Sequence, residues 1–331
     1  MTIAIPVYNG GEPLLEAIES CRFINLSHDD FEVLVVNNCS NDGSIEKVKS
    51  EFDNFKPLRI IDNDKNYGRI GNWNRCLELA DGEFILFLFA NDLFAKDNHI
   101  DKALRVIKDN QNCSLVNMPW IISNFKMTEK YLPPQFFYRT PGYGYFECVD
   151  HIKSVVEMGK LPFVPLQSNI VRMSLINKGD IQFDPTLPIT SDGLFLARLA
   201  AETNVVGFYE KPSVLWRNDA PNRLHGHLKL NEHNQQLLKS FSLINDLIDN
   251  KINLAKAFSK GKGLENVLVS LISVRTKKDM KIVNIVLNDW IKAVKSYKLN
   301  MIEFITRTLW EAIKLPLKIK TFTKLMSNRR N

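Results

Sequence analysis

Polar and aromatic side chains follow four apolar segments in the first third of the chain. Tyr8, Asn38 and Asp92 end or follow three of them, and the stretch DNDKNYG follows the fourth. A tyrosine ring can stack on a nucleobase, an amide can donate to and accept from its edge, and a carboxylate is a hard ligand for Mg²⁺ or Mn²⁺. A nucleoside diphosphate would satisfy all three groups. Asn and Asp are also common turn and helix-cap residues, so each has a purely structural alternative.

Short apolar runs alternate with helical patterns through residues 1–118, which predicts an α/β fold. In this fold an open, mostly parallel sheet carries crossover helices on both faces. We expect strands over 2–7, 31–38, 58–63, 83–90 and 113–119, and helices over 12–24, 42–52, 69–80 and 97–109. Ligands of such sheets bind at the carboxyl ends of the strands, so the four polar segments should meet at one edge.

From residue 119 to 225 the alternation of apolar runs and helical patterns becomes irregular. Residues 131–146 are rich in proline, glycine and aromatic residues, which predicts a loop or short hairpin over a site. A helix is expected over 191–201, followed by two strands within 204–217. Beyond residue 228 the chain reads as wholly helical. We therefore predict a main domain over 1–225, with halves 1–118 and 119–225, and a helical appendage over 226–331.

Charge is distributed unevenly along the chain. The net charge of the 331 residues is +6, yet residues 251–331 hold 18 Lys and Arg against 5 Asp and Glu. This basic end suggests an anionic partner, either a membrane surface or nucleic acid. A solvated helical face rich in lysine is an equally good interpretation.

Cysteine usage and hydropathy indicate a reducing compartment. The five cysteines are odd in number and form no C-x-x-C pair, so neither a disulfide framework nor a zinc site is expected. The chain starts almost directly with an apolar strand, and no window approaches the roughly 18 apolar residues that span a bilayer. We expect a cytoplasmic protein that does not span the membrane.

The ordered motifs IPVYNGG, VVNNCSNDGS, NYGRIGNWNRCLELADGEFILFLFANDLF and FDPTLPITSDGLFLARLA resemble those of glycosyltransferase family 2, over about residues 2–220. The resemblance implies the GT-A fold, a doubly wound sheet. It also implies transfer of a sugar from a nucleoside diphosphate donor with inversion at the anomeric carbon. Residues 1–118 would then be the nucleotide-binding half and 119–225 the acceptor-binding half of a catalytic domain.

The family's functional positions map onto particular residues of this chain. Asp92 falls at the metal-binding carboxylate of the family's D-x-D-type motif, and Asp192 at the catalytic base. Asp192 could instead be an acid at a helix N-terminus, favoured by the dipole. The expected nucleotide-sugar-binding residues are Pro6, Tyr8, Asn9, Asn38, Asn66, Gly68, Asn74, Asn91 and Arg217. Arg217 is included because an arginine near the family's mobile loop could bind phosphate in a bidentate manner.

The chain departs from the family pattern near the expected metal. The usual aspartate pair after the second strand is Asn37-Asn38, and the acidic positions ahead of Asp92 are Phe89 and Asn91. Amides can still read a base edge, but they bring no negative charge. A single carboxylate should therefore hold Mg²⁺ or Mn²⁺ weakly until donor phosphates complete the coordination shell.

The sequence predicts an inverting, metal-assisted glycosyltransferase of surface polysaccharide biosynthesis that acts on a saccharide or lipid-linked glycan. The alternative is a non-catalytic sugar-nucleotide-binding or scaffold protein. The end of the chain has apolar residues at helical spacing over 301–313 and six basic residues from Lys314 onward. Such a segment could lie on the anionic inner face of the membrane, or its apolar face could pack on the main domain. The lysine-rich end lacks the aromatic interleaving of nucleic-acid binders, so we expect no nucleic-acid partner.

Overall fold

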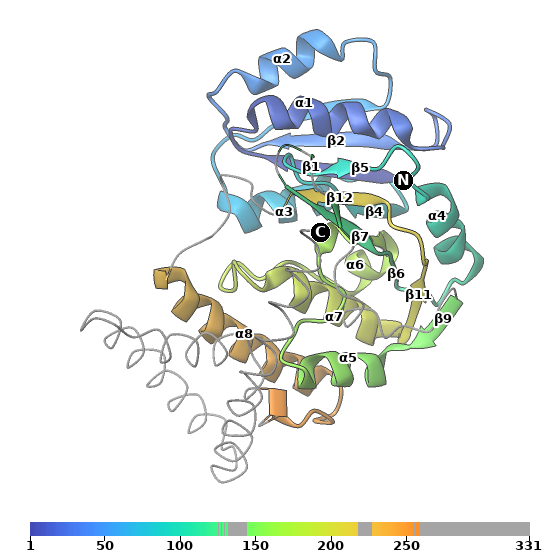
Figure 1. The fold of residues 1–331 in the computed structure, drawn as a ribbon, viewed down its shortest axis with the longest axis vertical. Coiled ribbons are helices and arrows are strands. Elements are labelled where there is room, and N and C mark those ends of the chain that lie inside the picture. Colours follow the sequence, from blue (N-terminus) through green and yellow to red (C-terminus); the bar gives the residue numbers. More distant parts are fainter. Residues whose placement is uncertain are drawn as a thin grey trace, which may run out of the picture. The chain divides into compact units, whose positions relative to one another are not determined.

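The computed structural model describes residues 1–124, 126, 128, 130–131, 144–217, 227–254 and 256–257 (Figure 1). Most of the expected loop over 131–146 and the basic end of the chain lie outside these residues. The chain divides into two compact units. The first comprises Met1–His151 and Phe163–Arg223, and the second Ile152–Pro162 and Leu224–Asn331. The predicted domain boundary at 225 stays a prediction.

The main sheet belongs to the first unit. Among the described residues it has eight strands in the order β3-β2-β1-β4-β10-β6-β11-β9. The strands are β1 (Thr2–Val7), β2 (Glu32–Asn37), β3 (Leu58–Asp62), β4 (Phe84–Phe87), β6 (Leu115–Asn117), β9 (Gly144–Glu147), β10 (Asn169–Arg172) and β11 (Val205–Phe208). The neighbours β3-β2, β2-β1, β1-β4 and β6-β11 are parallel, while β10 and β9 run antiparallel to the strands beside them. The predicted α/β fold with a mostly parallel sheet is confirmed.

Helices cover both faces of this sheet because the central strands are apolar on both sides. The helices of the first half are α1 (Gly11–Ser20), with the 3-10 turn η1 (Cys21–Phe23), α2 (Ser44–Glu51), α3 (Gly68–Leu79) and α4 (Ile100–Asp109). Alternate residues of β1, β2 and β4 join apolar residues of α1, α2 and α4 in one buried core. On the other face Phe87 of β4 packs edge-on against Phe183, with ring centroids 5.6 Å apart.

The remaining helices follow the first half in the chain. They are α5 (Cys148–Glu157), the 3-10 turn η3 (Leu166–Ser168), α6 (Met173–Gly179), α7 (Ser191–Thr203) and α8 (His227–Leu247). The predicted helix over 191–201 is confirmed by α7. In the second unit, Phe241, Ile244 and Ile248 are buried, and the Asn245 amide oxygen accepts from the Ile252 backbone N–H at 2.8 Å. None of the helices in the described parts of the chain is long and apolar enough to cross a bilayer.

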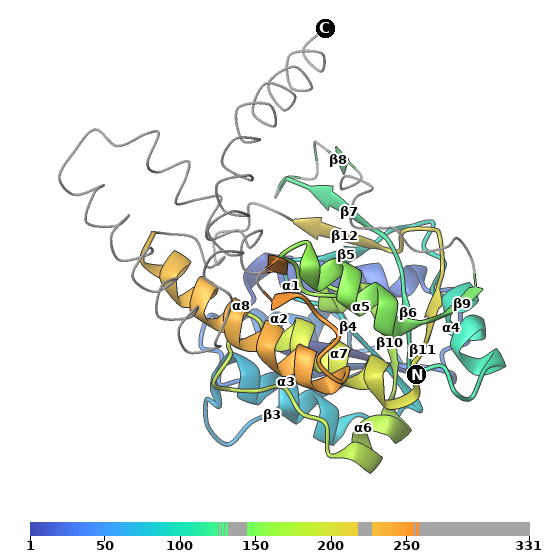
Figure 2. The ribbon, with the colours of Figure 1, turned by 90° about the horizontal axis from the view of Figure 1, so that it is seen from below.

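A second, smaller sheet was not expected from the sequence. In the described residues its order is β5 (Leu93–Phe94), β12 (Val214–Arg217), β7 (Trp120–Ser123) and β8 (Lys130–Tyr131), and the strands lie side by side in Figure 2. Each has only two to four residues, which is too short for alternation to show. The two strands predicted within 204–217 exist, but β11 belongs to the main sheet and β12 to the small one. The strand β10, inserted between β4 and β6, was also missed.

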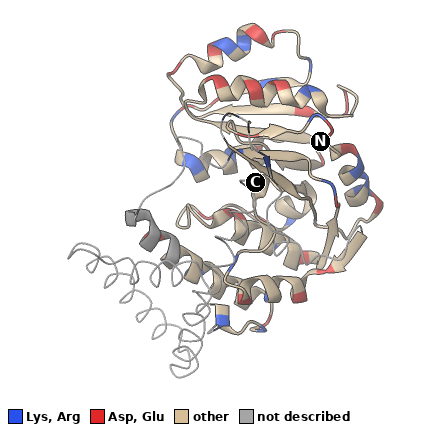
Figure 3. Ribbon diagram, in the orientation of Figure 1, with Lys and Arg blue, Asp and Glu red and all other residues tan. Residues whose placement is uncertain are grey.

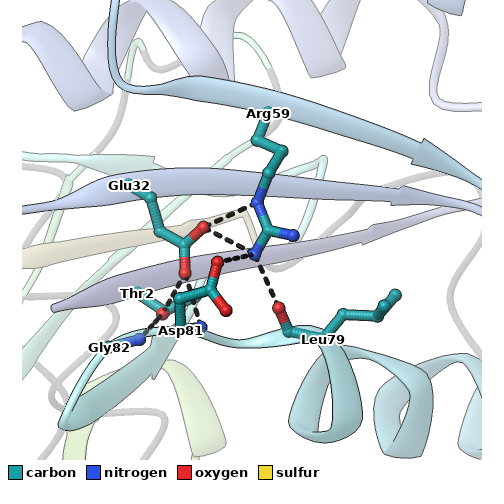
Figure 4. Close-up of polar contacts among 6 residues, drawn as sticks. All are labelled: Thr2, Glu32, Arg59, Leu79, Asp81 and Gly82. Atoms are coloured by element: carbon teal, nitrogen blue, oxygen red, sulfur yellow. Dashed lines mark hydrogen bonds and ion pairs between the residues drawn. The ribbon is translucent and has the colours of Figure 1, made fainter.

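A polar network joins the amino ends of the strands, opposite the expected site (Figure 4). Arg59 forms ion pairs with Glu32 at 2.7 Å and with Asp81 at 3.0 Å, and it donates to the Leu79 carbonyl at 2.6 Å. Thr2 donates to Glu32 at 2.5 Å and accepts from the Gly82 N–H at 2.9 Å. A Cβ at position 82 would lie 2.5 Å from the Thr2 nitrogen, so this close approach requires glycine.

Candidate functional site

The loops after β1 and β2 are tied together at the carboxyl edge of the sheet. The Asn9 N–H donates to Ser40 Oγ, and the Asn9 amide oxygen accepts from the Asn41 N–H, both at 2.9 Å. Asn9 has a φ of 52°, a left-handed conformation that asparagine tolerates. Pro6 is half-buried within β1. Tyr8 is 54% exposed, so its ring is available to a ligand.

Asn38 is the hub of this edge. It is only 2% exposed, and its backbone N–H donates to the Val7 carbonyl at 2.8 Å. Its amide nitrogen donates to Asn66 Oδ1 at 2.8 Å and to the Gly68 carbonyl at 3.2 Å. Its amide oxygen accepts from Asn63 Nδ2 at 3.1 Å and from the Tyr67 N–H at 2.9 Å. The amide predicted to read a base therefore holds the neighbouring loop in place.

Asn66 and Gly68 shape the start of α3. The Asn66 side chain accepts from the Gly68 N–H at 2.8 Å, and Gly68 has a φ of +71°, which favours glycine. Between them Tyr67 is 38% exposed. Tyr8 follows Val7, whose carbonyl accepts from the Asn38 backbone N–H, and the Tyr67 backbone N–H donates to the Asn38 side chain. Sequence reasoning missed Tyr67, although its place inside the N-x-G stretch was a usable signal.

Asp92 lies just beyond β4 with its carboxylate oriented by two donors. Its Oδ2 accepts from Gln167 Nε2 at 2.9 Å, and its Oδ1 accepts from the Arg217 backbone N–H at 3.0 Å. Asp92 is 3% exposed and Gln167 1%. Asn91 is half-buried beside them. Gln167 was not predicted, because it comes from η3 and no sequence motif connects it with position 92.

Arg217, expected to bind phosphate, is held inside the protein. Its guanidinium forms an ion pair with Glu16 of α1, and the residue is only 4% exposed. Its backbone binds Asp92, as described above. The guanidinium of Arg217 therefore contacts α1, while its backbone N–H contacts the carboxylate of Asp92.

Asn74 positions the segment that leads into α7. Its amide donates to the Phe183 carbonyl at 3.0 Å and accepts from the Phe183 N–H at 2.9 Å. The Phe183 ring stacks on Phe195 of α7 at 4.0 Å and meets Trp73 of α3 edge-on at 5.2 Å. These contacts fix the segment against α3, so Asn74 acts on the loop rather than through an exposed amide.

Asp192 stands in the first turn of α7, as predicted. Its Oδ1 accepts from the Gly193 N–H at 2.8 Å. Although part of its surface remains accessible, burial raises the pKa of the Asp192 carboxyl, while the Gly193 bond and the positive charge of Arg69 oppose that rise. Arg69 donates to the Pro188 carbonyl and lies over the Trp73 ring at 5.5 Å. A raised pKa makes the carboxylate a stronger base.

Asp92 and Asp192 are linked by a short series of contacts. Phe89, three residues before Asp92, stacks on Trp73 at 5.1 Å. Trp73 lies under the guanidinium of Arg69, whose charge acts on Asp192. The segments that carry the two acids are therefore connected through the rings of Phe89 and Trp73 and the guanidinium of Arg69. Phe89, which replaces an acid of the family motif, belongs to this series.

The described residues supply one carboxylate for a cation, and no group of three or more His, Cys, Asp or Glu side chains within them could enclose a metal ion. A cation at Asp92 is compatible with this arrangement only if a phosphate-bearing ligand provides further oxygens.

Comparison with known proteins finds a family model that matches part of the chain and solved structures with a similar fold. Residues 2–162 match the model described as glycosyl transferase family 2. The chain is 23% identical over 204 residues to a poly(ribitol-phosphate) beta-N-acetylglucosaminyltransferase, TarS, of Staphylococcus aureus. The match covers 61% of this chain and 33% of the relative, so the chain corresponds to about a third of that protein's length.

Two solved structures share the fold. The crystal structure of S. aureus TarS 1–349 in complex with UDP-GlcNAc has a TM-score of 0.64 at 18% identity, covering 96% of this chain and 91% of that one. A mannosyltransferase from Pyrobaculum calidifontis, in complex with GDP-Man and Mn²⁺, has a TM-score of 0.55 at 15% identity, covering 96% and 86%. At these identities the likeness establishes the architecture alone.

Proposed function

We propose, from the premise that residues 2–162 of this chain belong to glycosyl transferase family 2, that the protein is an inverting glycosyltransferase with a nucleoside diphosphate sugar as donor. The resemblance seen in the sequence is confirmed by this family match. The observation that supports activity best is the series of contacts through Phe89, Trp73 and Arg69 that connects the segments of Asp92 and Asp192, since an inverting transfer needs separate groups for the leaving diphosphate and the acceptor proton.

The donor nucleoside lies at the edge formed after β1 and β2 in this proposal. Tyr8 and Tyr67 offer exposed rings in the segments that bind Asn38, and base–aromatic stacking contributes about 1–3 kcal/mol per base. Asn38, Asn66 and Gly68 position the loop, as their mutual hydrogen bonds support. Pro6, Asn9, Asn74 and Asn91 complete the proposed donor site, and Arg217 supports it through Asp92.

Mg²⁺ or Mn²⁺ would be held by Asp92 together with the donor diphosphate. The bound cation would supply positive charge for the diphosphate as it leaves. Gln167 and the Arg217 backbone N–H orient the Asp92 carboxylate. One carboxylate predicts weak metal binding in the absence of donor.

Asp192 would act as the general base. The acceptor hydroxyl oxygen forms a bond to the anomeric carbon while the bond from that carbon to the diphosphate oxygen breaks. The hydroxyl proton passes to the Asp192 carboxylate, and the diphosphate leaves with the bonding electrons. Attack from the face opposite the leaving group inverts the anomeric configuration. Burial of Asp192 supports this assignment because it raises the carboxylate's proton affinity.

For the acceptor we propose a saccharide, a lipid-linked glycan or a phosphate-containing polymer of the cell surface, because one relative is a poly(ribitol-phosphate) beta-N-acetylglucosaminyltransferase. A cytoplasmic position at the inner face of the membrane, reached through the basic end, remains part of the proposal. That end lies outside the described residues.

Substitution of Asp192 tests the mechanism. Asp192→Asn should bind UDP as the wild type does but lose transfer from UDP-GlcNAc and other donors by about 100-fold or more, the usual contribution of a general base. The matched control is Asp180→Asn, an exposed position with a left-handed φ that asparagine tolerates. Normal transfer by Asp192→Asn would refute the mechanism. Tight UDP binding without turnover in the wild type would favour the scaffold alternative instead.

A further inference from the structure

The α1 helix carries three glutamates, and two of them form ordinary surface ion pairs. Glu12, Glu16 and Glu19 belong to the row of acidic residues visible along α1 in Figure 3. Glu12 pairs with Lys47 of α2, and Glu19 pairs with Arg22 at 2.9 Å. The four side chains of these two pairs are between 39% and 68% exposed. Ion pairs between side chains that remain in water contribute little to stability.

Glu16 differs because its partner is a buried cation. It pairs with the Arg217 guanidinium, and the side chain of Arg217 is 4% exposed while that of Glu16 is 54% exposed. Removing the negative partner of a buried cation is strongly unfavourable, because the remaining charge has lost both water and counter-charge. The Glu16 carboxylate therefore helps to keep the Arg217 side chain in its buried position.

The backbone of Arg217 contacts the carboxylate proposed to hold the cation. The pairing of β12 with β5 ends at Leu215 and Leu93. Asp92, the residue before Leu93, accepts the Arg217 backbone N–H on Oδ1 at 3.0 Å. The end of β12 is thus bound to Asp92 through the backbone of Arg217 and to α1 through its side chain.

The α1 helix is itself anchored independently of Glu16. Its apolar side lies in the core of the main sheet, through Leu14, Leu15, Ala17 and Ile18. Four residues after Glu16, the Ser20 hydroxyl oxygen accepts the Phe94 backbone N–H of β5 at 3.0 Å. Residues four apart lie on the same face of a helix, so one face of α1 contacts both β5 and β12. These are the two strands that adjoin Asp92.

We propose that Glu16 is a positioning residue of the cation site. Its carboxylate neutralises the Arg217 guanidinium, which keeps the Arg217 backbone N–H on Asp92 Oδ1 and so sets the direction of the Asp92 carboxylate. Replacement of a residue that orients a metal ligand commonly lowers metal affinity by about 10- to 100-fold. The inference rests on the proposed function, because it assigns Glu16 to the cation site of that reaction.

Calorimetric titration of the full chain with UDP, first in EDTA and then at increasing Mn²⁺ concentrations, tests this role. Glu16→Gln removes the charge with little change in shape. Glu19→Gln is the matched control, because it removes an equal charge from an exposed pair of the same helix. Glu16→Asp keeps the charge but withdraws it from the Arg217 guanidinium. Arg217→Met, alone and combined with Glu16→Gln, completes a double-mutant cycle.

Glu16→Gln should bind UDP in EDTA as the wild type does. The Mn²⁺ concentration that gives half of the maximal increase in UDP affinity should rise roughly tenfold. A role in stability alone would weaken UDP binding under both conditions. Glu16→Asp should give a smaller rise, and Glu19→Gln should match the wild type. In the Arg217→Met background Glu16→Gln should have no further effect, because no guanidinium is left to neutralise.

An equal Mn²⁺ response in Glu16→Gln and Glu19→Gln would overturn the inference, and so would a wild type whose UDP binding does not respond to Mn²⁺. A further loss from Glu16→Gln in the Arg217→Met background would also overturn it, since Glu16 would then act through its charge alone. A wild-type response in Glu16→Asp would lead to the same conclusion without a change at position 217. Absence of sugar transfer in the wild type would contradict the proposed function, whereas the titrations with UDP and Mn²⁺ would still decide the role of Glu16.

Discussion

The Asp92 carboxylate accepts a hydrogen bond from Gln167 Nε2 at 2.9 Å, with both residues almost completely buried. These residues are 75 positions apart in the chain, and they come from the residue directly before β5 and from η3. The amide leaves the charge on Asp92 while it fixes the direction of one oxygen. The site therefore depends on a residue that no motif of the sequence contains.

Replacement of Gln167 by methionine removes the donor but keeps the volume. We expect a loss of about 1–3 kcal/mol in the free energy of unfolding, because a buried carboxylate oxygen loses its partner. The KM for the donor should rise more than kcat falls, since Gln167 orients Asp92 and does not reach the reacting carbon. Urea unfolding and steady-state kinetics measure the two effects. Gln182→Met, at an exposed position, is the control, and an unchanged KM for Gln167→Met would contradict this role.

The pKa of Asp192 predicts how stability depends on pH. Burial raises this pKa above the value in the unfolded chain, so the folded state favours the protonated carboxyl. Its contribution to stability is present below the unfolded pKa and is lost as pH rises through the folded pKa. Asp192→Asn should therefore be more stable than the wild type at neutral pH, and the difference should disappear in acid. Equal or lower stability at neutral pH would contradict the burial of this charge.

Arg69 should influence the activity profile through Asp192. Its positive charge lowers the pKa of the Asp192 carboxyl and opposes the effect of burial. Arg69→Gln should move the acid limb of the kcat profile to higher pH, because the base becomes protonated more readily. Arg75→Gln, on the same helix, is the comparison, since Arg75 pairs with Glu78. An unchanged pH profile in Arg69→Gln would show that Arg69 does not influence the pKa of the Asp192 carboxyl.

Restoring the family's acid at position 38 should harm this protein. The Asn38 amide nitrogen donates to Asn66 Oδ1 and to the Gly68 carbonyl, and an aspartate there would face both oxygens with a negative charge. We expect Asn38→Asp to lose about 1–3 kcal/mol of unfolding free energy at neutral pH. The loss should be smaller in acid, where the carboxyl can donate one bond. Asn41→Asp, at an exposed position, serves as control, and equal stability of the two variants would show that Asn38 is not the hub.

Cys39 provides a probe of the donor edge. It is the one exposed cysteine among the five, all of which lie in the described residues, and it adjoins Asn38. Burial raises the pKa of Cys113 to about 11 and of Cys148 to about 12, which keeps these thiols unreactive. One cysteine of the native protein should react with a thiol reagent, and all five should react after denaturation. UDP should slow the first reaction, Cys39→Ser should abolish it, and a lack of UDP protection would place the donor elsewhere.

The sequence alone determined the elements of residues 1–118 and the edge of the sheet at which their strands end. Strand periodicity and buried apolar runs are local properties, so β1 to β4 and their helices could be predicted, and so could the place of Tyr8 and Asn38 at strand ends and of Asp192 at a helix start. The strand predicted over 83–90 ends at Phe87, and Asp92 directly precedes β5, a strand of two residues that the sequence did not predict. The ordered motifs added the family. Only the tertiary structure decided what each side chain binds.

Hydrogen bonds between residues far apart in the chain carry no local signal, and this is why the partners could not be predicted. The sequence suggests that the Asn38 amide is exposed to a ligand. In the fold this amide makes four hydrogen bonds to other residues of the protein. The sequence predicts that Arg217 binds phosphate, yet its guanidinium forms an ion pair with Glu16, which lies 201 positions away in the chain. The small sheet is built from strands of two to four residues, which are too short to be stable without their neighbours. The residue types were set by the sequence, and their roles were set by which distant segments folding brings together.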